Sequence, residues 1–156
     1  MKVIAVIPAR YKSTRFEGKP LVNLCGKPMI WWVHHQLCQV KGLSEIYVAT
    51  DDERIRKVCS DYGIKYVMTS DSHPTHLDRL AEFAENIESD FYININGDEP
   101  LMMPEYVERL LPTSDLNPVD FYFANAMTKI KKTVEVADIS RIKVVTDNLG
   151  YAMYMA

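Results

Sequence analysis

Basic and hydroxyl side chains are concentrated in residues 8–21, directly after the first apolar run of the chain. The basic members are Arg10, Lys12, Arg15 and Lys19, and they are accompanied by Ser13, Thr14 and Gly18. Guanidinium and ammonium groups neutralise a polyphosphate, and backbone N–H groups of such a loop can cradle it further. The glycine spacing fits neither a P-loop nor a G-x-G-x-x-G turn. The pattern therefore indicates a phosphate-binding loop of another kind or, alternatively, a solvated basic loop.

A second polar segment, Asn96-Gly97-Asp98-Glu99-Pro100, follows a later apolar run. Asp98 stands beside a glycine that allows close approach of the backbone, which suits a hard cation. Mg²⁺ prefers one or two carboxylates together with phosphate oxygens and water. Every residue type in this segment also forms turns, so a purely structural turn is the alternative. Its place near a basic loop favours a metal site at Asp98.

A third polar segment opens a predicted helix at residues 73–79. Thr75 and Asp78 match a capping box, and a structural role suits both. Arg79 lies off the predicted apolar stripe of this helix, where it could reach a ligand or be solvated. His73 and His76 have a metal-like spacing without cysteine partners, which argues against zinc. Elsewhere, the pair at residues 51–52 is most simply a helix cap, and His34-His35 beside Trp31-Trp32 suggests packing or an interface.

The elements that must position these residues alternate between strand and helix. Apolar runs at 3–7, 46–50, 64–68 and 91–95 predict strands, and helices are expected near 28–40, after Asp51-Asp52, near 77–87 and after Pro104. The stripe of the third helix is expected to hold Leu77, Leu80, Ala81, Ala84 and Ile87. This alternation predicts an α/β fold with a mostly parallel, Rossmann-like sheet and helices on both faces. Ligands of such sheets bind at the carboxyl ends of the strands.

The alternation of strands and helices ends at a surface loop expected at 112–120. Residues 121–127 and 142–146 resemble strands, and the turn residues 147–150 before the apolar run 151–155 predict a hairpin. The chain stops inside that run. We expect residues 1–156 to form one nucleotide-binding catalytic domain that is incomplete at its C-terminus.

Composition is that of an ordinary globular protein, with 47% hydrophobic and 25% charged residues. The formal net charge of −3 gives no electrostatic argument for nucleic acid or a membrane surface. Cys25, Cys38 and Cys59 form no C-x-x-C pair, which favours reduced thiols. No apolar run approaches the roughly 20 residues of a membrane span. A cytoplasmic location is expected.

Taken together, these residues resemble the N-terminal half of the 3-deoxy-manno-octulosonate (KDO) cytidylyltransferase, or CMP-KDO synthetase, family. The matching segments cover the whole chain and are residues 7–11, 13–15, 18–21, 26–29, 49–52, 96–100, 143–145 and 150–152. The first motif is specific, because sialate cytidylyltransferases carry a glycine pair and a lysine where this loop has Tyr11-Lys12 and Arg15. Sugar-1-phosphate nucleotidyltransferases have a G-x-G-T-R loop, which is absent here. The resemblance implies a nucleotide-diphospho-sugar transferase fold.

The resemblance also implies a reaction, in which CTP and a 2-keto sugar acid give a CMP-sugar and pyrophosphate with Mg²⁺ as cofactor. It implies that Arg10, Arg15 and Lys19 hold the triphosphate and that Asp98 binds Mg²⁺. The Pro8-Ala9 backbone and Arg79 would lie near the cytosine, and Asn96 would contact CTP. A homodimer of the full-length protein and a role in lipopolysaccharide or capsule synthesis follow from the same resemblance.

Three departures from the family pattern bear on these expectations. Asn96 stands where the family has glutamine, and Thr75-His76-Leu77 replaces Ser-Gly-Thr, which leaves the identity of the sugar acid open. Family members also continue for roughly another hundred residues, so a chain ending at Ala156 is expected to bind CTP weakly and turn over little. The alternatives are a synthetase for another acid such as a sialate, a metal-dependent glycosyltransferase, and an inactive truncated nucleotide-binding module. The glycosyltransferase lacks support because Asp98-Glu99 has no D-x-D spacing.

Overall fold

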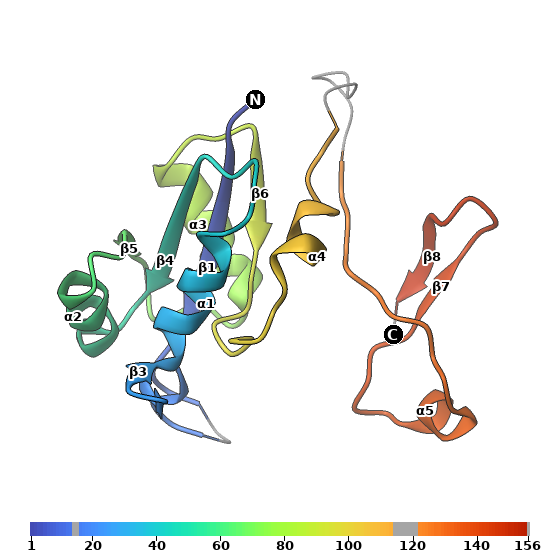
Figure 1. The fold of residues 1–156 in the computed structure, drawn as a ribbon, viewed down its shortest axis with the longest axis horizontal. Coiled ribbons are helices and arrows are strands. Elements are labelled where there is room, and N and C mark those ends of the chain that lie inside the picture. The colour runs from blue at the N-terminus through green and yellow to red at the C-terminus, as the bar shows by residue number, and fades with distance from the viewer. Residues whose placement is uncertain (14–15, 114–121, 156) are drawn as a thin grey trace. The chain divides into compact units, whose positions relative to one another are not determined.

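The computed structural model describes residues 1–13, 16–113 and 122–155. Contacts between Cα atoms divide the chain into two compact units, Met1–Asp115 and Leu116–Ala156, which are described separately here. The expectation of one catalytic domain over residues 1–156 stays a prediction. All of the predicted site residues belong to the first unit, which also holds the larger sheet (Figure 1).

The first unit is built on a four-stranded parallel sheet with the order β5-β4-β1-β6. The strands are β1 (Val3–Ala9), β4 (Glu45–Thr50), β5 (Tyr66–Met68) and β6 (Phe91–Asn94). All four coincide with the predicted apolar runs, and β1 occupies the middle of the sheet (Figure 1). Because the strands are parallel, their carboxyl ends meet at one edge.

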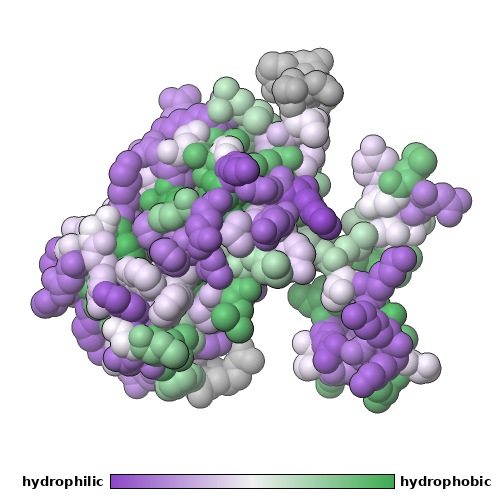
Figure 2. Space-filling view, in the orientation of Figure 1, coloured by the Kyte–Doolittle hydropathy of each residue, from purple (hydrophilic) through white to green (hydrophobic). Residues whose placement is uncertain are grey.

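Helices cover both faces of this sheet, as the alternating pattern predicted. They are α1 (Met29–Leu37), α2 (Glu53–Asp61), α3 (His76–Asn86) and α4 (Pro104–Glu108). Alternate side chains of β1 enter two separate clusters: Ala5 and Ile7 pack with α1 and α2, whereas Ile4 and Val6 pack with Phe83 of α3. This alternation explains why β1 is an unbroken apolar run, since both of its faces are buried. The visible surface is mostly hydrophilic (Figure 2).

Three short elements separate β1 from α1. They are the 3-10 turn η1 (Lys19–Leu21) and the two-residue strands β2 (Asn23–Leu24) and β3 (Lys27–Pro28), which pair antiparallel. Pro28 is the N-cap of α1, close to the predicted start of that helix. The helix α4 begins at Pro104 as predicted and ends at Glu108, before Pro112. Residues 112 and 113 of the expected loop have no regular structure, and 114–120 lie outside the described residues.

The predicted apolar stripe of α3 was wrong in part. Leu80, Ala84 and Ile87 are partly buried, but Leu77 is 58% exposed and Ala81 is exposed too. The fully buried positions are Phe83 and Arg79 instead. The buried face is therefore rotated about the helix axis relative to the predicted stripe. The prediction used apolar residues only, so it could not include Arg79, which is buried.

The second unit contains α5 (Thr133–Ala137) and a hairpin of β7 (Val144–Thr146) and β8 (Ala152–Met155). The predicted hairpin is confirmed, with Asp147 Oδ1 accepting hydrogen bonds from the backbone N–H groups of Leu149 and Tyr151. The strand predicted at 121–127 is wrong for residues 122–127, which have no regular structure, and residue 121 lies outside the described residues. In the part of the chain that the structure describes, no helix combines the length and apolar character needed to cross a membrane.

Candidate functional site

The carboxyl ends of β1 and β6 lie side by side and bring the two predicted polar segments together. We call residues 10–19 the basic loop and residues 96–100 the acidic turn. Gly97 packs so close to the end of β1 that a Cβ added to it would lie 3.4 Å from the Pro8 carbonyl oxygen. Lys19 Nζ lies 2.5 Å from Asp98 Oδ2, and the two side chains keep 38% and 44% of their exposure. The two segments thus share one solvent-accessible edge of the sheet.

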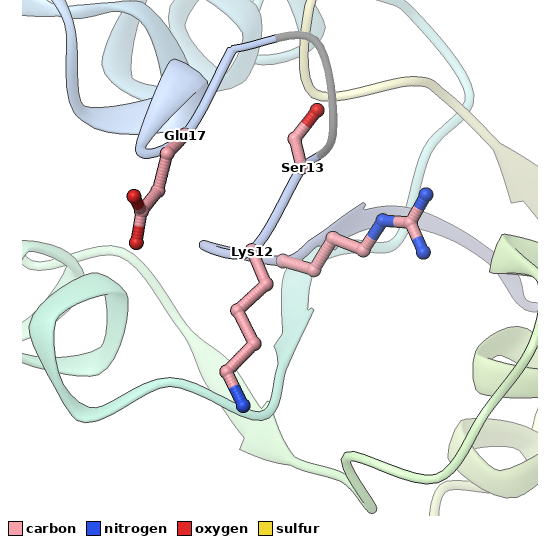
Figure 3. Close-up of a pocket in the computed structure, with 4 residues that line it drawn as sticks. Lys12, Ser13 and Glu17 are labelled. Atoms are coloured by element: carbon pink, nitrogen blue, oxygen red, sulfur yellow. The ribbon is translucent and has the colours of Figure 1, made fainter.

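The basic loop closes on itself at its two ends. The Gly18 N–H donates to the Tyr11 carbonyl oxygen at 2.8 Å, and Gly18 has a φ of 68°, a conformation that glycine adopts without strain. A cavity of about 370 Å³ is lined by Arg10, Lys12, Ser13 and Glu17. Figure 3 shows Lys12, Ser13 and Glu17 around it. Thr14 and Arg15 lie outside the described residues, so the position predicted for Arg15 is not described.

The acidic turn presents one carboxylate to the shared edge. Asp98 and Glu99 are both exposed, but Asp98 pairs with Lys19, whereas Glu99 accepts a hydrogen bond from Asn96 Nδ2 at 3.1 Å. The described residues contain no cluster of three or more His, Cys, Asp or Glu side chains suited to a metal. A single carboxylate beside basic groups nevertheless fits Mg²⁺, which takes one or two carboxylates and completes its shell with phosphate oxygens and water.

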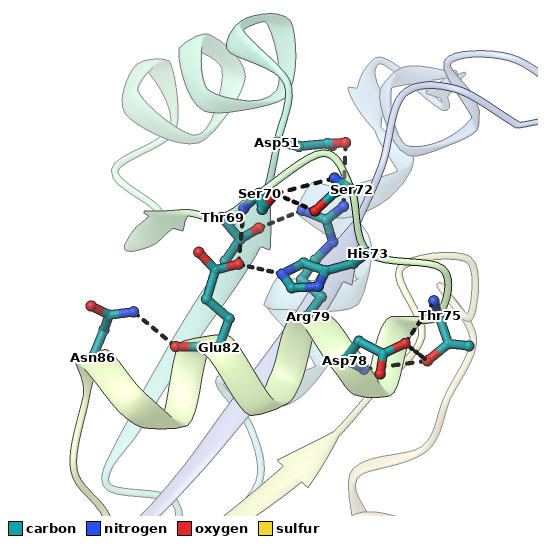
Figure 4. Close-up of polar contacts among 10 residues, drawn as sticks. All are labelled: Asp51, Thr69, Ser70, Ser72, His73, Thr75, Asp78, Arg79, Glu82 and Asn86. Atoms are coloured by element: carbon teal, nitrogen blue, oxygen red, sulfur yellow. Dashed lines mark hydrogen bonds and ion pairs between the residues drawn. The ribbon is translucent and has the colours of Figure 1, made fainter.

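Arg79 is buried, which excludes the solvated alternative set out from the sequence and leaves its contact with a ligand a prediction. It is 3% exposed, its guanidinium forms an ion pair of 3.2 Å with Asp51, and it donates a hydrogen bond to Thr69 Oγ1 (Figure 4). Asp51 and Thr69 directly follow β4 and β5. Arg79 therefore ties together the carboxyl ends of these two strands, beside the end of β1.

The neighbouring acidic residues have different roles. Asp52, not Asp51, is the N-cap of α2, where its side chain accepts from the Arg54 N–H at 2.9 Å. The interpretation of 51–52 as a cap is thus right for Asp52 alone. The buried Asp51 Oδ1 has no hydrogen-bond partner among the described residues, which leaves this oxygen as an unsatisfied acceptor next to Arg79.

The segment before α3 is held to the helix by two sets of contacts (Figure 4). The predicted capping box is confirmed, because the Thr75 and Asp78 side chains each accept from the other residue's backbone N–H. Glu82 contacts His73 and accepts from the Ser70 N–H at 2.8 Å, and these contacts lower the pKa of Glu82. His73 therefore pairs with a carboxylate of α3.

Two residues that sequence reasoning did not single out also shape this region, one within the basic loop and one packed against it. Glu17 lines the cavity within the loop, and the guanidinium carbon of Arg54 lies 3.2 Å from the centre of the Tyr11 ring. No spacing rule connects Arg54 with Tyr11, since Arg54 belongs to α2 and Tyr11 to the basic loop. The only signal in the sequence was the position of Arg54 soon after β4, at the binding edge of a parallel sheet.

Comparison with known proteins yields one family and several similar chains. The cytidylyltransferase family model matches residues 4–156. The 3-deoxy-manno-octulosonate cytidylyltransferase of Geotalea uraniireducens is 43% identical over all of this chain and 62% of its own length. The 8-amino-3,8-dideoxy-manno-octulosonate cytidylyltransferase of Shewanella sp. is 41% identical over all of this chain and 65% of its own length. The chain thus spans somewhat less than two thirds of these relatives.

A solved structure shares the fold over the whole chain. It is that of a CMP:2-keto-3-deoxy-manno-octonic acid synthetase complexed with CTP, which is 37% identical and superposes with a TM-score of 0.88. This likeness covers 100% of this chain and 64% of the other. With the family model matching nearly every residue, the chain belongs to the cytidylyltransferase family.

Proposed function

We propose that the protein is a cytidylyltransferase that converts CTP and a 2-keto sugar acid of the 3-deoxy-manno-octulosonate type into a CMP-sugar and pyrophosphate. In this reaction an oxygen–phosphorus bond forms between the anomeric hydroxyl and the α-phosphate. The bond between the α-phosphate and the bridging oxygen breaks, and pyrophosphate leaves with that oxygen. Such chemistry depends on positioning and charge neutralisation more than on covalent participation of the protein.

The observation that carries the proposal is the contact between Lys19 and Asp98. It unites a cationic group suited to phosphate and a carboxylate suited to a cation at the binding edge of a parallel sheet. A nucleoside triphosphate with a divalent cation needs both kinds of group within a few ångströms. The names of the relatives, which include synthetases for 3-deoxy-manno-octulosonate and for its 8-amino analogue, support this choice of acceptor.

Each predicted site residue receives a role in this proposal. Arg10, Arg15 and Lys19 hold the triphosphate, and Asn96 contributes a polar contact to CTP. The Pro8-Ala9 backbone and Arg79 border the cytosine, in keeping with their places at the ends of β1, β4 and β5. Asp98 holds Mg²⁺, which neutralises charge on the phosphate oxygens when it is bound.

The wider biological expectations belong to the same proposal. They are a cytoplasmic location, a homodimer of the full-length protein, no nucleic-acid or membrane partner, and a role in making lipopolysaccharide or capsule. They rest on the family resemblance and on the modest net charge of −3. The reaction proposed at Lys19 and Asp98 does not depend on any of these expectations.

The test is pyrophosphate release by the complete protein from CTP, Mg²⁺ and 3-deoxy-manno-octulosonate. UTP and ATP serve as alternative nucleotides, and the 8-amino-3,8-dideoxy acid and sialic acid as alternative acceptors. Asp98→Ala is run beside Asp61→Ala, because Asp61 also pairs with a lysine, Lys57 Nζ at 2.7 Å, but lies on α2 away from the acidic turn.

Release that depends on CTP and an octulosonate, is lost in Asp98→Ala and survives in Asp61→Ala is the expected result. Release with sialic acid alone would keep the reaction class and change the acceptor. The place to look would then be the Thr75-His76-Leu77 segment, where His76 and Leu77 are exposed. CTP binding without release from any acid would overturn the proposal in favour of a nucleotide-binding module.

A further inference from the structure

Arg54 is held in one orientation by the residue that caps its own helix. Its Nε donates to Asp52 Oδ1 at 2.9 Å and its terminal NH2 group donates to Asp52 Oδ2 at 2.7 Å. Two parallel hydrogen bonds between a guanidinium and a carboxylate fix the plane of the arginine as well as its position. Asp52 is itself fixed, because the same Oδ1 caps α2 through the Arg54 N–H.

The plane fixed in this way lies against Tyr11, the second residue of the basic loop. The guanidinium carbon of Arg54 is 3.2 Å from the centre of the Tyr11 ring. The ring is also confined by Gly18, since a Cβ added there would lie 3.0 Å from two ring carbons. The Tyr11 carbonyl oxygen accepts from the Gly18 N–H at 2.8 Å. Tyr11 thus joins both ends of the basic loop to the start of α2.

We propose that Arg54, clamped by Asp52 and stacked on Tyr11, is a positioning residue that orders residues 10–12 of the basic loop before the nucleotide binds. The proposal rests on the proposed function, because it assigns the basic loop to the triphosphate. Arg10 and Lys12 flank Tyr11 directly, so the stack fixes the backbone from which both cationic side chains extend. Arg54 does not need to touch the substrate for this role.

The physical gain is a smaller entropic cost of binding. A loop that is already ordered loses less conformational freedom when it closes on a ligand. Such preorganisation stabilises the bound ground state and the transition state equally. Its loss therefore raises KM for CTP and leaves kcat largely unchanged. A residue that contacts the reacting phosphate would lower kcat instead.

The test compares variants of the complete protein. Arg54→Met removes the stack, Tyr11→Leu removes its partner, and Asp52→Asn keeps a good helix cap while weakening the charged clamp. The matched control is Arg56→Met, which lies on the same helix and pairs with Glu53 at 2.5 Å but makes none of the contacts to the basic loop described above. Thermal unfolding of all variants checks that the fold is retained.

The first readout is independent of catalysis. Trypsin cleaves after Arg10 and Lys12, on either side of Tyr11, and mass spectrometry follows both sites in the nucleotide-free protein. We expect cleavage to be about threefold to tenfold faster in Arg54→Met and Tyr11→Leu, the range set by a cation–π contact. Arg56→Met should cleave at the wild-type rate. Tyr11→Phe, which keeps the ring, should keep the protection.

The second readout is the kinetics of pyrophosphate release. We expect KM for CTP to rise about threefold to tenfold in Arg54→Met with little change in kcat, and the double variant with Tyr11→Leu to be no worse than either single change. Three results would each overturn the proposal. They are additive effects on KM in the double variant, trypsin cleavage of Arg54→Met and Tyr11→Leu at the rate of Arg56→Met, and a fall in kcat of Arg54→Met at unchanged KM. Loop protection without any pyrophosphate release from wild type would overturn the proposed function but not the stack.

Discussion

Lys19 Nζ and Asp98 Oδ2 lie 2.5 Å apart although the two residues are 79 positions apart in the sequence. In the nucleotide-free protein each side chain therefore neutralises the other. In the proposed function, a nucleoside triphosphate with a divalent cation would offer a new partner to both, phosphate to Lys19 and the cation to Asp98. The ion pair thus holds in place the two groups that the proposed reaction requires, and the proposal predicts that both exchange partners when substrate binds.

Lys19→Met is expected to lower kcat for pyrophosphate release by about 10²–10³-fold. Removing one preorganised charge from a site that works by electrostatic stabilisation has an effect of that size. Steady-state kinetics of the complete protein measure it. Lys57→Met is the control, because Lys57 also pairs with an aspartate, Asp61, on an exposed helix surface. Equal kcat values in the two variants would contradict the role given to Lys19.

Lys19→Met is also expected to strengthen the binding of a divalent cation to the nucleotide-free protein. In wild type the ammonium group competes for Asp98, and a partly exposed ion pair worth about 1 kcal/mol corresponds to roughly fivefold in affinity. Titration with Mn²⁺, followed by its electron paramagnetic resonance signal, measures the change. Asp98→Ala in the same background should abolish the gain, and unchanged Mn²⁺ affinity in Lys19→Met would disprove the competition.

Arg79→Met is expected to destabilise the protein by about 3 kcal/mol in urea unfolding. The guanidinium is 3% exposed, and removing one partner of a buried pair leaves the carboxylate of Asp51 without its charge partner. Arg56→Met, at an exposed ion pair of α2, should change the stability far less. If the two variants unfold at the same urea concentration, the buried pair does not contribute as proposed.

Acid is expected to destabilise the first unit partly through Glu45. Hydrogen bonds from Lys65, Tyr47 and Lys2 lower the pKa of Glu45 from 4.5 to about 2. Because the folded-state pKa lies below the unfolded one, the stabilisation is complete above pH 4.5 and is lost as the pH falls towards 2. Thermal unfolding across this range should show wild type losing its advantage over Glu45→Gln. A constant difference between them down to pH 2.5 would contradict the lowered pKa.

The three cysteines are expected to react with a thiol reagent at different rates. Cys59 is fully buried, and burial raises the pKa of its thiol to about 12, so it should react only after unfolding. Cys25 and Cys38 are exposed, and partial burial raises the pKa of Cys38, which should therefore react more slowly than Cys25. Counting thiols in native and denatured protein at pH 8 measures this. Three fast-reacting thiols in the native protein would contradict the buried position of Cys59.

The sequence by itself determined the architecture of the first unit and the polar segments that follow its strands. Apolar runs buried on both faces, such as residues 3–7, have one common explanation, a parallel sheet covered by helices. Short-range rules also identified the capping box at Thr75 and Asp78 and the hairpin turn at Asp147, because these depend on residues a few positions apart. The family resemblance rested on the same local segments.

Tertiary structure alone decided which distant side chains meet. The burial of Arg79 depends on Asp51 and Thr69, which arrive from the ends of two other strands, and no periodic pattern places an arginine in a core. The stack of Arg54 on Tyr11 likewise joins the first turn of α2 to the basic loop, and only the parallel order β4-β1 brings these two segments side by side. The periodicity of apolar residues predicts which face of a single helix or strand is buried. An ion pair or a ring contact depends instead on the separation of two elements in space. That separation is fixed by the packing of the whole sheet and its helices.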